Sequence, residues 1–168
     1  MLRVEPVSST HDRTGFDCGN PSLNTFLKTT ARQHGEKGVS RTFVLVDSDA
    51  PSMIIGFFTL TLCEVEAESL PAAQETRYPQ HKLPAVRLAR LGVANFHKKK
   101  GYGGMLVAEA VSRTLIVAAQ AGSVGLFVDA KDGDAIAFYQ HFGFVHIPGR
   151  PNQLFLPLKT LRASQSST

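Results

Sequence analysis

The fold is decided by the stretch Lys98-Lys99-Lys100-Gly101-Tyr102-Gly103-Gly104, called the phosphate loop below. It lies between a run typical of a β-strand, Val86 to Val93, and a run typical of a helix, Met105 to Ala121. Glycines let a backbone approach a ligand closely, and the first N–H groups of a helix have no partner within that helix. The helix dipole and the lysines add positive charge at the same end. The stretch therefore predicts a phosphate site, although an ordinary solvated helix start fits these residues alone equally well.

Length and composition predict one globular domain. The chain has 168 residues, of which 43% are hydrophobic and 11 are Phe, enough to bury a sizeable core. No apolar run approaches the roughly 20 residues needed to cross a bilayer, and the start of the chain lacks the apolar core of a secretory signal. We expect a soluble, cytoplasmic protein with a single domain over residues 1–162 and a flexible tail at 163–168.

The two cysteines, Cys18 and Cys63, stand singly rather than in a pair spaced for a metal or a redox disulfide. We therefore expect buried free thiols and no metal site.

Positive charge is unevenly distributed. The formal net charge is only +4, but residues 77–100, called the basic run below, hold seven Lys or Arg and no acidic residue. Such a field attracts polyanions, either a phosphorylated cofactor or nucleic acid. For Arg77 and Lys82, in an expected loop, a solvated surface strip is the alternative. Arg87 and Arg90 fall within an apolar strand pattern and therefore need partners or a cleft.

The chain alternates strand and helix patterns, which predicts an α/β domain with a mixed sheet. Asn20 and Pro21 give a helix start, with Asn as the cap and Pro at the first helical position. Residues 64–84 are expected to form a loop with room for one short helix. Strands are expected at Leu2 to Pro6, Arg41 to Asp47, Ile54 to Leu62, Val86 to Val93, Leu126 to Ala130, Phe144 to Ile147 and Gln153 to Leu158, and further helices at Met105 to Ala121 and about Asp134 to His141.

Two known phosphate-binding folds do not fit the phosphate loop. A nucleotide-hydrolysing P-loop needs Gly-x-x-x-x-Gly-Lys-Ser/Thr, whereas Gly104 is followed by Met105. A dinucleotide fold needs Gly-x-Gly-x-x-Gly directly after its first strand, and here Gly-x-Gly-Gly follows a later strand.

Two motifs in the right order resemble the GNAT superfamily of acetyl-CoA-dependent N-acetyltransferases. Lys98-x-x-Gly101-x-Gly103 is similar to the family's Gln/Arg-x-x-Gly-x-Gly/Ala, and the segment from Asp132 to Phe144 is similar to its Asn-x-x-Ala-x-x-Phe-Tyr-x-x-x-Gly-Phe. Further stretches resemble GNAT toxins of the TacT type: Phe16-Asp17-Cys18-Gly19-Asn20-x-x-Leu23-x-x-Phe26-Leu27, Arg41-Thr42-Phe43-Val44, Leu88-Ala89-Arg90-Leu91-Gly92-Val93, Val128-Asp129-Ala130 and Leu154-Phe155-Leu156-Pro157-Leu158-Lys159.

The resemblance implies a GNAT fold, a mixed central sheet flanked by helices, in which a splayed strand pair holds acetyl-CoA. It implies acetylation of the α-amine of the amino acid on charged tRNA, a ribbon-helix-helix antitoxin as partner, and a homodimer. The implied cofactor contacts are the backbone at Leu91, Gly92 and Val93 for the acetyl group and pantetheine, the phosphate loop (Lys98, Lys99, Lys100, Gly101, Tyr102, Gly103, Gly104) for the pyrophosphate, and Asp132 and Phe138.

Tyr139 is the candidate for catalysis. Acyl transfer from a thioester needs protonation of the departing thiolate, which a phenol can supply. No general base stands out among His81, His97, His141 and His146, and the α-amine of an aminoacyl ester is acidic enough to be largely neutral without one. A covalent acetyl-enzyme through Cys63 is a disfavoured alternative because that thiol has no evident base.

A tRNA acceptor needs a positive surface, for which the candidates are Arg41, Arg77, Lys82, Arg87 and Arg90. Aromatic residues near the basic run are few, so we expect shape and charge to dominate over base stacking. A GNAT enzyme acting on a small amine or a protein lysine stays open as an alternative, as does a non-catalytic module that keeps the fold.

Overall fold

The computed structural model describes residues 1–71, 78 and 81–166. Its strands form one seven-stranded mixed sheet in the order β1-β2-β3-β4-β5-β7-β6, which confirms the predicted fold class. The strands are β1 (Leu2–Pro6), β2 (Arg41–Asp47), β3 (Gly56–Glu66), β4 (Lys82–Val93), β5 (Gly125–Asp129), β6 (Val145–Ile147) and β7 (Arg150–Pro157), and the helices are α1 (Pro21–Thr29), α2 (Ala31–Glu36), η1 (Ala67–Ser69), η2 (Asn95–His97), α4 (Tyr102–Gln120), α5 (Gly133–His141) and α6 (Leu158–Ser166).

The chain separates into two compact units. The first contains Met1–Thr61 and Ala89–Ala110, and the second contains Leu62–Leu88 and Val111–Thr168. Three elements, β3, β4 and α4, have residues in both units. The assignment of residues 1–162 to a single domain stays a prediction.

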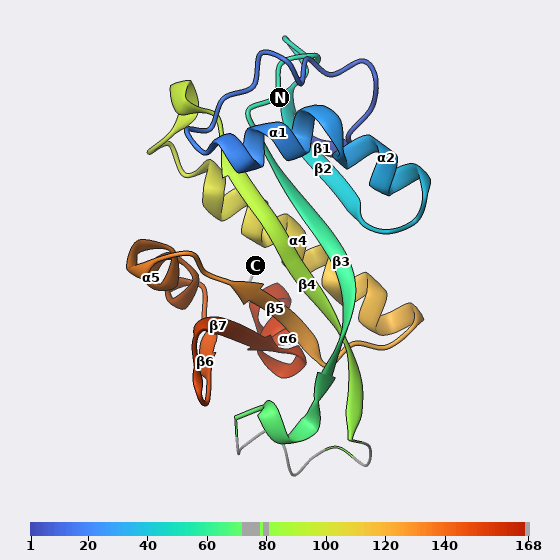
Figure 1. Ribbon diagram of the computed structural model, residues 1–168, viewed down its shortest axis with the longest axis vertical. Helices are drawn as coiled ribbons and strands as arrows, with labels where there is room; N and C mark the ends of the chain where they lie inside the picture. The colour runs from blue at the N-terminus through green and yellow to red at the C-terminus, as the bar shows by residue number, and fades with distance from the viewer. Residues whose placement is uncertain (72–77, 79–80, 167–168) are drawn as a thin grey trace. The chain divides into compact units, whose positions relative to one another are not determined.

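The first unit is built on an antiparallel ladder of β1, β2 and the start of β3. Helix α1 begins as predicted, because Asn20 Oδ1 accepts hydrogen bonds from the backbone N–H groups of Ser22 and Leu23 at 3.0 and 3.2 Å. Helix α2 packs against α1 and β2 (Figure 1). The core of this unit centres on Phe57, whose ring meets that of Phe16 edge-on at 5.5 Å.

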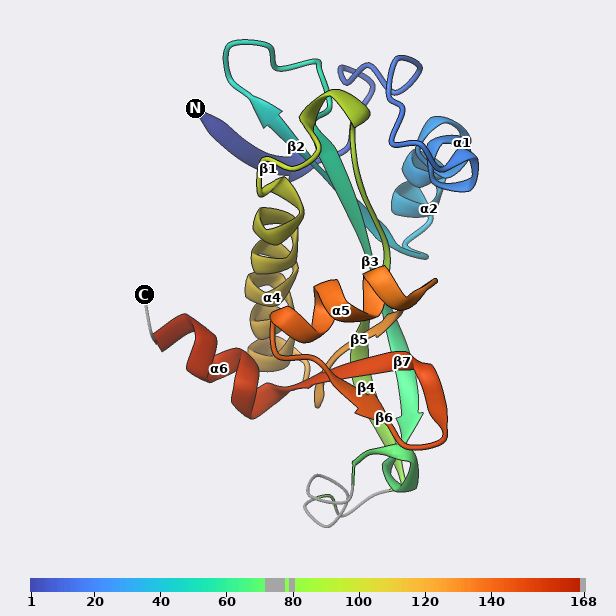
Figure 2. The ribbon, with the colours of Figure 1, turned by 90° about the vertical axis from the view of Figure 1, so that its left-hand side faces the viewer.

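The second unit contains the parallel pair of β4 and β5, with β7 and β6 continuing antiparallel. Phe127 and Phe155 stack in its core with ring centroids 4.5 Å apart. Helix α5 lies against β7, and α6 lies against β7 and β5 (Figure 2). Because α6 continues to Ser166, residues 163–166, expected to form a flexible tail, are helical.

The loop expected over residues 64–84 was predicted too long at both ends. Strand β3 continues to Glu66, and β4 already begins at Lys82. The end of β3 alternates exposed and half-buried residues, with charged side chains on the exposed face. An alternation with a period of two is typical of a strand. It was missed in the sequence because Glu64 and Glu66 lower the apolar content of this stretch.

Helix α4 begins at Tyr102, three residues before the predicted start, so Gly103 and Gly104 lie in its first turn. By length and composition alone it could cross a membrane, with a mean hydropathy of 1.2 over 18 residues. The core helix of a globular fold has the same composition, and α4 buries Leu106, Val107, Ala110, Val111 and Thr114.

Candidate functional site

The phosphate loop has a backbone shape that exposes N–H groups. Lys99 and Gly101 both have positive φ, 64° and 84°, so the chain turns sharply just before α4. The first hydrogen bond of the helix runs from the N–H of Met105 to the carbonyl of Gly101 at 3.3 Å. The N–H groups of the residues between them, at the start of α4, therefore have no partner within the helix. A Cβ atom added at Gly101 would meet no other atom within 4 Å. Glycine is therefore favoured there because of the positive φ of the backbone, and not because a side chain would clash with its neighbours.

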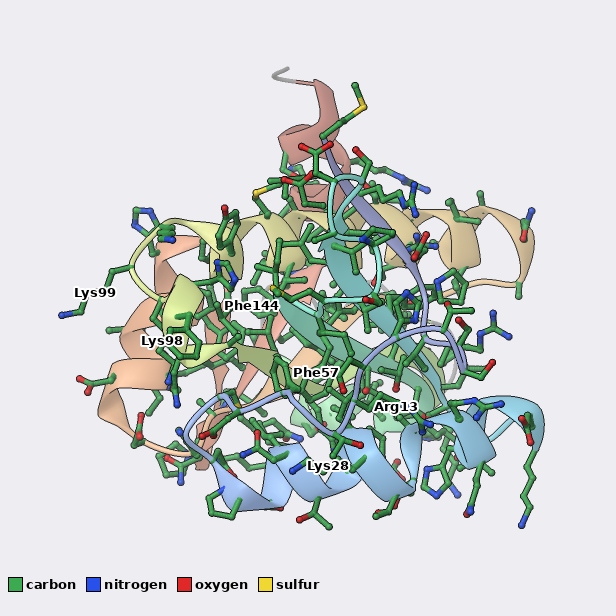
Figure 3. All side chains as sticks on the ribbon, turned by 90° about the horizontal axis from the view of Figure 1, so that it is seen from above. Arg13, Lys28, Phe57, Lys98, Lys99 and Phe144 are labelled. Carbon is green, nitrogen blue, oxygen red and sulfur yellow. The ribbon has the colours of Figure 1, made fainter. Side chains whose placement is uncertain are left out.

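The three lysines of the loop do different things. Lys98, Lys99 and Lys100 are all exposed, but the ammonium of Lys98 donates a hydrogen bond to the carbonyl of Cys18 at 2.6 Å. Figure 3 shows Lys99 reaching away from the ribbon and Lys98 turned back toward the segment that precedes α1. All three positive charges thus lie at the loop surface, and that of Lys98 is held in place by its hydrogen bond to Cys18.

The C-terminal part of β4 leaves backbone groups open on one edge. In the described residues, β4 pairs with β5 only at Val86, Arg87 and Leu88, although β4 continues to Val93. On the packed side, a Cβ added at Gly92 would lie 3.2 Å from Phe57 Cε1 and 3.3 Å from Cys18 Sγ. Glycine at position 92 therefore lets the backbone at Leu91 to Val93 pack tightly on one side while its edge stays open.

His97 supplies a further polar atom beside the loop. In the described part of the chain its Nδ1 is buried without a hydrogen-bond partner, and its ring meets that of Tyr102 edge-on at 5.9 Å. A buried polar atom that lacks a partner is costly. The open N–H groups and the exposed Lys99 and Lys100 fit a multiply charged, hydrogen-bonding group such as a pyrophosphate, whereas this nitrogen is buried away from the surface.

Tyr139 lies on α5 in the second unit and is buried, with 8% of its surface exposed. Its ring meets those of Phe138 and Phe144 edge-on, with centroids 5.1 and 5.4 Å away. Burial raises the pKa of Tyr139 to about 12. The phenol is therefore fully protonated at neutral pH, which suits a proton donor and excludes it as a base.

Asp132 and Phe138, the other predicted residues of this segment, have structural roles of their own. Asp132 is the N-cap of α5, and its Oδ1 accepts from the N–H of Ala135 at 2.9 Å. Phe138 is half-buried and packs edge-on against Tyr139 and Phe142. A contact of either residue with a cofactor stays a prediction.

The basic run contains no acidic residue, but in the folded protein two of its cations contact carboxylates from other parts of the chain. Arg87 donates to Asp129 of β5 at 3.0 Å, and Lys82 forms a 3.5 Å ion pair with Glu64 of β3. Neighbouring strands, distant in sequence, supply both carboxylates.

The other predicted tRNA residues differ in exposure. The Arg90 guanidinium lies 3.7 Å above the centroid of the Phe26 ring, and burial lowers its pKa. Arg41 is exposed and helps line a pocket of about 310 Å³ beside α2. Arg77 lies outside the described residues.

Cys63 is half-buried, and burial raises the pKa of its thiol, with nearby Arg87 acting in the opposite direction. Because the thiolate is the nucleophile, the raised pKa argues against a covalent acetyl-enzyme. Among the described residues, no cluster of His, Cys, Asp and Glu could hold a metal ion.

No role was predicted for Cys18 and its neighbours, although the stretch from Phe16 to Asn20 is one of those that carry the resemblance. In the structure, the Cys18 thiol packs against the Gly92 backbone, and the Cys18 carbonyl accepts a hydrogen bond from Lys98 Nζ. A backbone acceptor has no signature in the sequence, so only the unusual stretch itself could have marked it.

The fold, the open strand edge and the phosphate loop define an acetyltransferase of the GNAT class. The chain belongs to the acetyltransferase (GNAT) family, which matches residues 17–144.

Among individual proteins, the chain is similar to the "Probable toxin TacT" of Sinorhizobium fredii, with 28% identity over 169 residues that cover 95% of this chain and 93% of that protein. It is 31% identical over 157 residues to the "tRNA-acetylating toxin" of Mycobacterium tuberculosis, covering 94% and 92% of the two chains. Among solved structures, a Tyr-to-Phe mutant of KacT has a TM-score of 0.91, 32% identity, and coverage of 97% of this chain and 98% of that one. AtaT complexed with acetyl-methionyl-tRNAfMet has a TM-score of 0.91 and 28% identity, with 98% and 99% covered.

Proposed function

We propose that this protein is a toxin that transfers an acetyl group from acetyl-CoA to the α-amine of the amino acid on charged tRNA, and so removes that tRNA from translation. Support comes from family membership, from a relative named a tRNA-acetylating toxin, and from AtaT, which was solved with an acetylated aminoacyl-tRNA and, in the AtaTR complex, with acetyl-CoA. The observation that carries the proposal is the phosphate loop, in which the left-handed Lys99 and Gly101 directly precede N–H groups that have no partner within α4.

The chain has residues for each part of the chemistry. The N–H groups from Lys99 to Gly104 would hold the pyrophosphate, and the open edge from Leu91 to Val93 would bond the pantetheine arm and the acetyl carbonyl. When bound, acetyl-CoA supplies the acetyl group as a thioester. The hydroxyl of Tyr139 would donate its proton to the departing sulfur.

For the tRNA we propose phosphate contacts by exposed cations. Arg41 and Lys82 are exposed, and the ion pair of Lys82 with Glu64 is open to solvent, so both remain available. Arg87 and Arg90 are engaged within the fold, and their share in tRNA binding is smaller in this proposal. Arg77 is included on its sequence position alone.

We further propose a cytoplasmic homodimer that is neutralised by an antitoxin with a ribbon-helix-helix domain. The supporting structures are AtaT bound to the C-terminus of the antitoxin AtaR and a KacTA–DNA complex. Co-expression with the proposed antitoxin should restore growth, and light scattering should give twice the mass of the chain.

The function is tested by incubating the protein with labelled acetyl-CoA and total charged tRNA. Label should appear on aminoacyl-tRNA, and Tyr139→Phe should lower turnover by about 100-fold or more while acetyl-CoA binding stays nearly intact. Tyr78→Phe, which removes the hydroxyl of another tyrosine of the second unit, is the control and should retain activity. Label on protein lysines or on small amines instead would replace the tRNA proposal with the alternative acceptor.

A further inference from the structure

Lys98 differs from the two lysines that follow it. Its Nζ donates to the carbonyl of Cys18 at 2.6 Å, a short distance typical of a charge-assisted hydrogen bond. Lys99 instead has a φ of 64°, which is unfavourable for a residue with a Cβ, and its side chain extends into solvent (Figure 3). The loop thus holds one lysine by a hydrogen bond to the segment that precedes α1, and it carries the next lysine in a strained backbone conformation with its side chain in solvent.

The carbonyl that Lys98 binds belongs to residues 17–20, called the anchor segment below, which are held by several hydrogen bonds. Asp17 Oδ1 accepts from the N–H of Gly19 at 2.8 Å and from the side-chain amide of Asn24 at 2.9 Å. Asn24 Oδ1 in turn accepts from the N–H of Cys18 at 3.0 Å. Asn20, at the end of the segment, caps α1. The anchor segment is therefore fixed to the first turn of α1.

The same segment also contacts the end of β4. The N–H of Asn95 donates to the carbonyl of Asp17 at 2.9 Å. A Cβ added at Gly92 would lie 3.3 Å from Cys18 Sγ, so that thiol packs directly behind the Gly92 backbone. One short segment thus touches both places proposed above for acetyl-CoA, the open strand edge at Gly92 and, through Lys98, the phosphate loop.

The charge of Lys98 is partly balanced where it lies. Its ammonium is bound to a carbonyl. The pKa of Asp17 is lowered mainly by hydrogen bonds from Gly19 and Asn24 and to a smaller extent by Lys28 and then Lys98, so Lys98 lies within electrostatic reach of that carboxylate. Lys99 and Lys100 are exposed and show no ion pair in the described residues. An anion at the loop would therefore be attracted chiefly by those two lysines.

We propose that Lys98 is a positioning residue that ties the phosphate loop to the anchor segment, whereas Lys99 supplies the charge that meets the phosphates of acetyl-CoA. This inference rests on the acetyl-CoA use proposed above. It gives the anchor segment a function, which is to fix the distance between the backbone that would hold the acetyl group and the loop that would hold the pyrophosphate.

The two roles are separated by the salt dependence of acetyl-CoA binding, measured by calorimetry at several NaCl concentrations. Lys99→Met removes an ion that salt screens, so the slope of log Kd against log salt should become shallower. Lys98→Met should weaken binding about 10-fold at every salt concentration and leave the slope unchanged. Lys98→Arg, which keeps a cationic donor, should recover most of the affinity. An equally shallow slope in Lys98→Met would overturn the proposal.

A second variant reaches the same contact from the anchor segment. A Cβ at Gly19 would lie 3.4 Å from Lys98 Nζ and 3.2 Å from Asn95 Oδ1, and Gly19 has a φ of 85°. Gly19→Ala should therefore weaken binding in the same way, and adding Lys98→Met to it should cost little more. Gly38→Ala is the matched control, because Gly38 has a φ of 73° and an added Cβ meets nothing within 4 Å. Additive losses from Gly19→Ala and Lys98→Met would contradict a shared contact.

A measurement on the protein without acetyl-CoA separates this inference from the proposed function. Amide hydrogen exchange of residues 95–101 should be at least about 10-fold faster in Lys98→Met than in the wild type and unchanged in Lys99→Met. If the wild type binds no acetyl-CoA, the proposed function fails, and exchange still decides whether Lys98 holds the loop. Equal exchange in both variants and the wild type would show that it does not.

Discussion

The two ends of the basic run carry similar charge but expose it differently. Along β4, Arg87 is paired with Asp129, Lys82 with Glu64, and Arg90 lies on the Phe26 ring. Beyond β4, Lys99 and Lys100 project from a turn into solvent. A strand places its side chains beside those of its neighbours, so its charges find partners from distant parts of the sequence. In the turn at the helix start, Lys98 is bound to a backbone carbonyl, whereas Lys99 and Lys100 show no ion pair in the described residues, so their charge stays available for a ligand.

The largest effect that tests this comparison is expected from charge reversal in the turn. The double variant Lys99→Glu/Lys100→Glu should weaken acetyl-CoA binding by about 100-fold at low salt, because two attractions become repulsions at the start of α4. Arg87→Gln should change the same dissociation constant less than about twofold. Calorimetry on both variants measures the difference, and a comparable loss in Arg87→Gln would break the comparison.

Tyr139 extends the comparison to a buried side chain, which burial keeps in its neutral, protonated form at neutral pH. Its pKa is raised to about 12 from a usual value of 10.0, so the folded state holds this proton more tightly than the unfolded chain does. The resulting stability is fully present below about pH 10 and is lost as the pH rises toward about 12, on the order of 2 kcal/mol in total. Urea unfolding between pH 9 and 12 should show this loss in the wild type, and a smaller one in Tyr139→Phe. Identical pH profiles would mean that Tyr139 ionises as a solvent-exposed phenol does.

Arg90 gives a smaller effect that sharpens the strand side of the comparison. Arg90→Gln keeps a polar side chain but removes the cation from the Phe26 ring, and it should lower the free energy of unfolding by about 0.5–1 kcal/mol. Lys28→Gln, an exposed cation on the same helix as Phe26, is the control and should change stability less. If Arg90→Gln leaves stability unchanged and instead weakens tRNA binding, Arg90 is a ligand residue after all.

The smallest effect is expected at the exposed end of β4. Lys82 and Glu64 are separated by 3.5 Å and are 66% and 63% exposed, so their coupling in a double-mutant cycle with Lys82→Met and Glu64→Gln should be below about 0.5 kcal/mol. The same Lys82→Met variant should weaken tRNA binding measurably, since a loosely held lysine can turn to a phosphate. Strong coupling with unchanged tRNA binding would mean that Lys82, like Arg87, serves to stabilise the fold and does not bind tRNA.

The sequence predicted the parts of the molecule that local patterns determine. The cap at Asn20, the strand Arg41–Asp47 and the order of strand, turn and helix around the phosphate loop are confirmed, although β4 and α4 both begin earlier than predicted. Apolar period, glycines and capping residues act over a few positions and therefore predict these features. What it could not predict depends on residues far apart in the chain. The partners of Lys82, Arg87 and Lys98 are a strand neighbour in the first two cases and a backbone carbonyl in the third, and none of them is marked by local spacing.

The most direct test of the account is mass spectrometry of the aminoacyl-adenosine released by nuclease from charged tRNA after incubation with the protein and acetyl-CoA. We expect the mass of one acetyl group to be added to the amino acid of at least one tRNA species, with the gain greatly reduced in both Tyr139→Phe and the Lys99→Glu/Lys100→Glu variant. Unmodified aminoacyl-adenosine in every species, from a protein that binds acetyl-CoA, would contradict it.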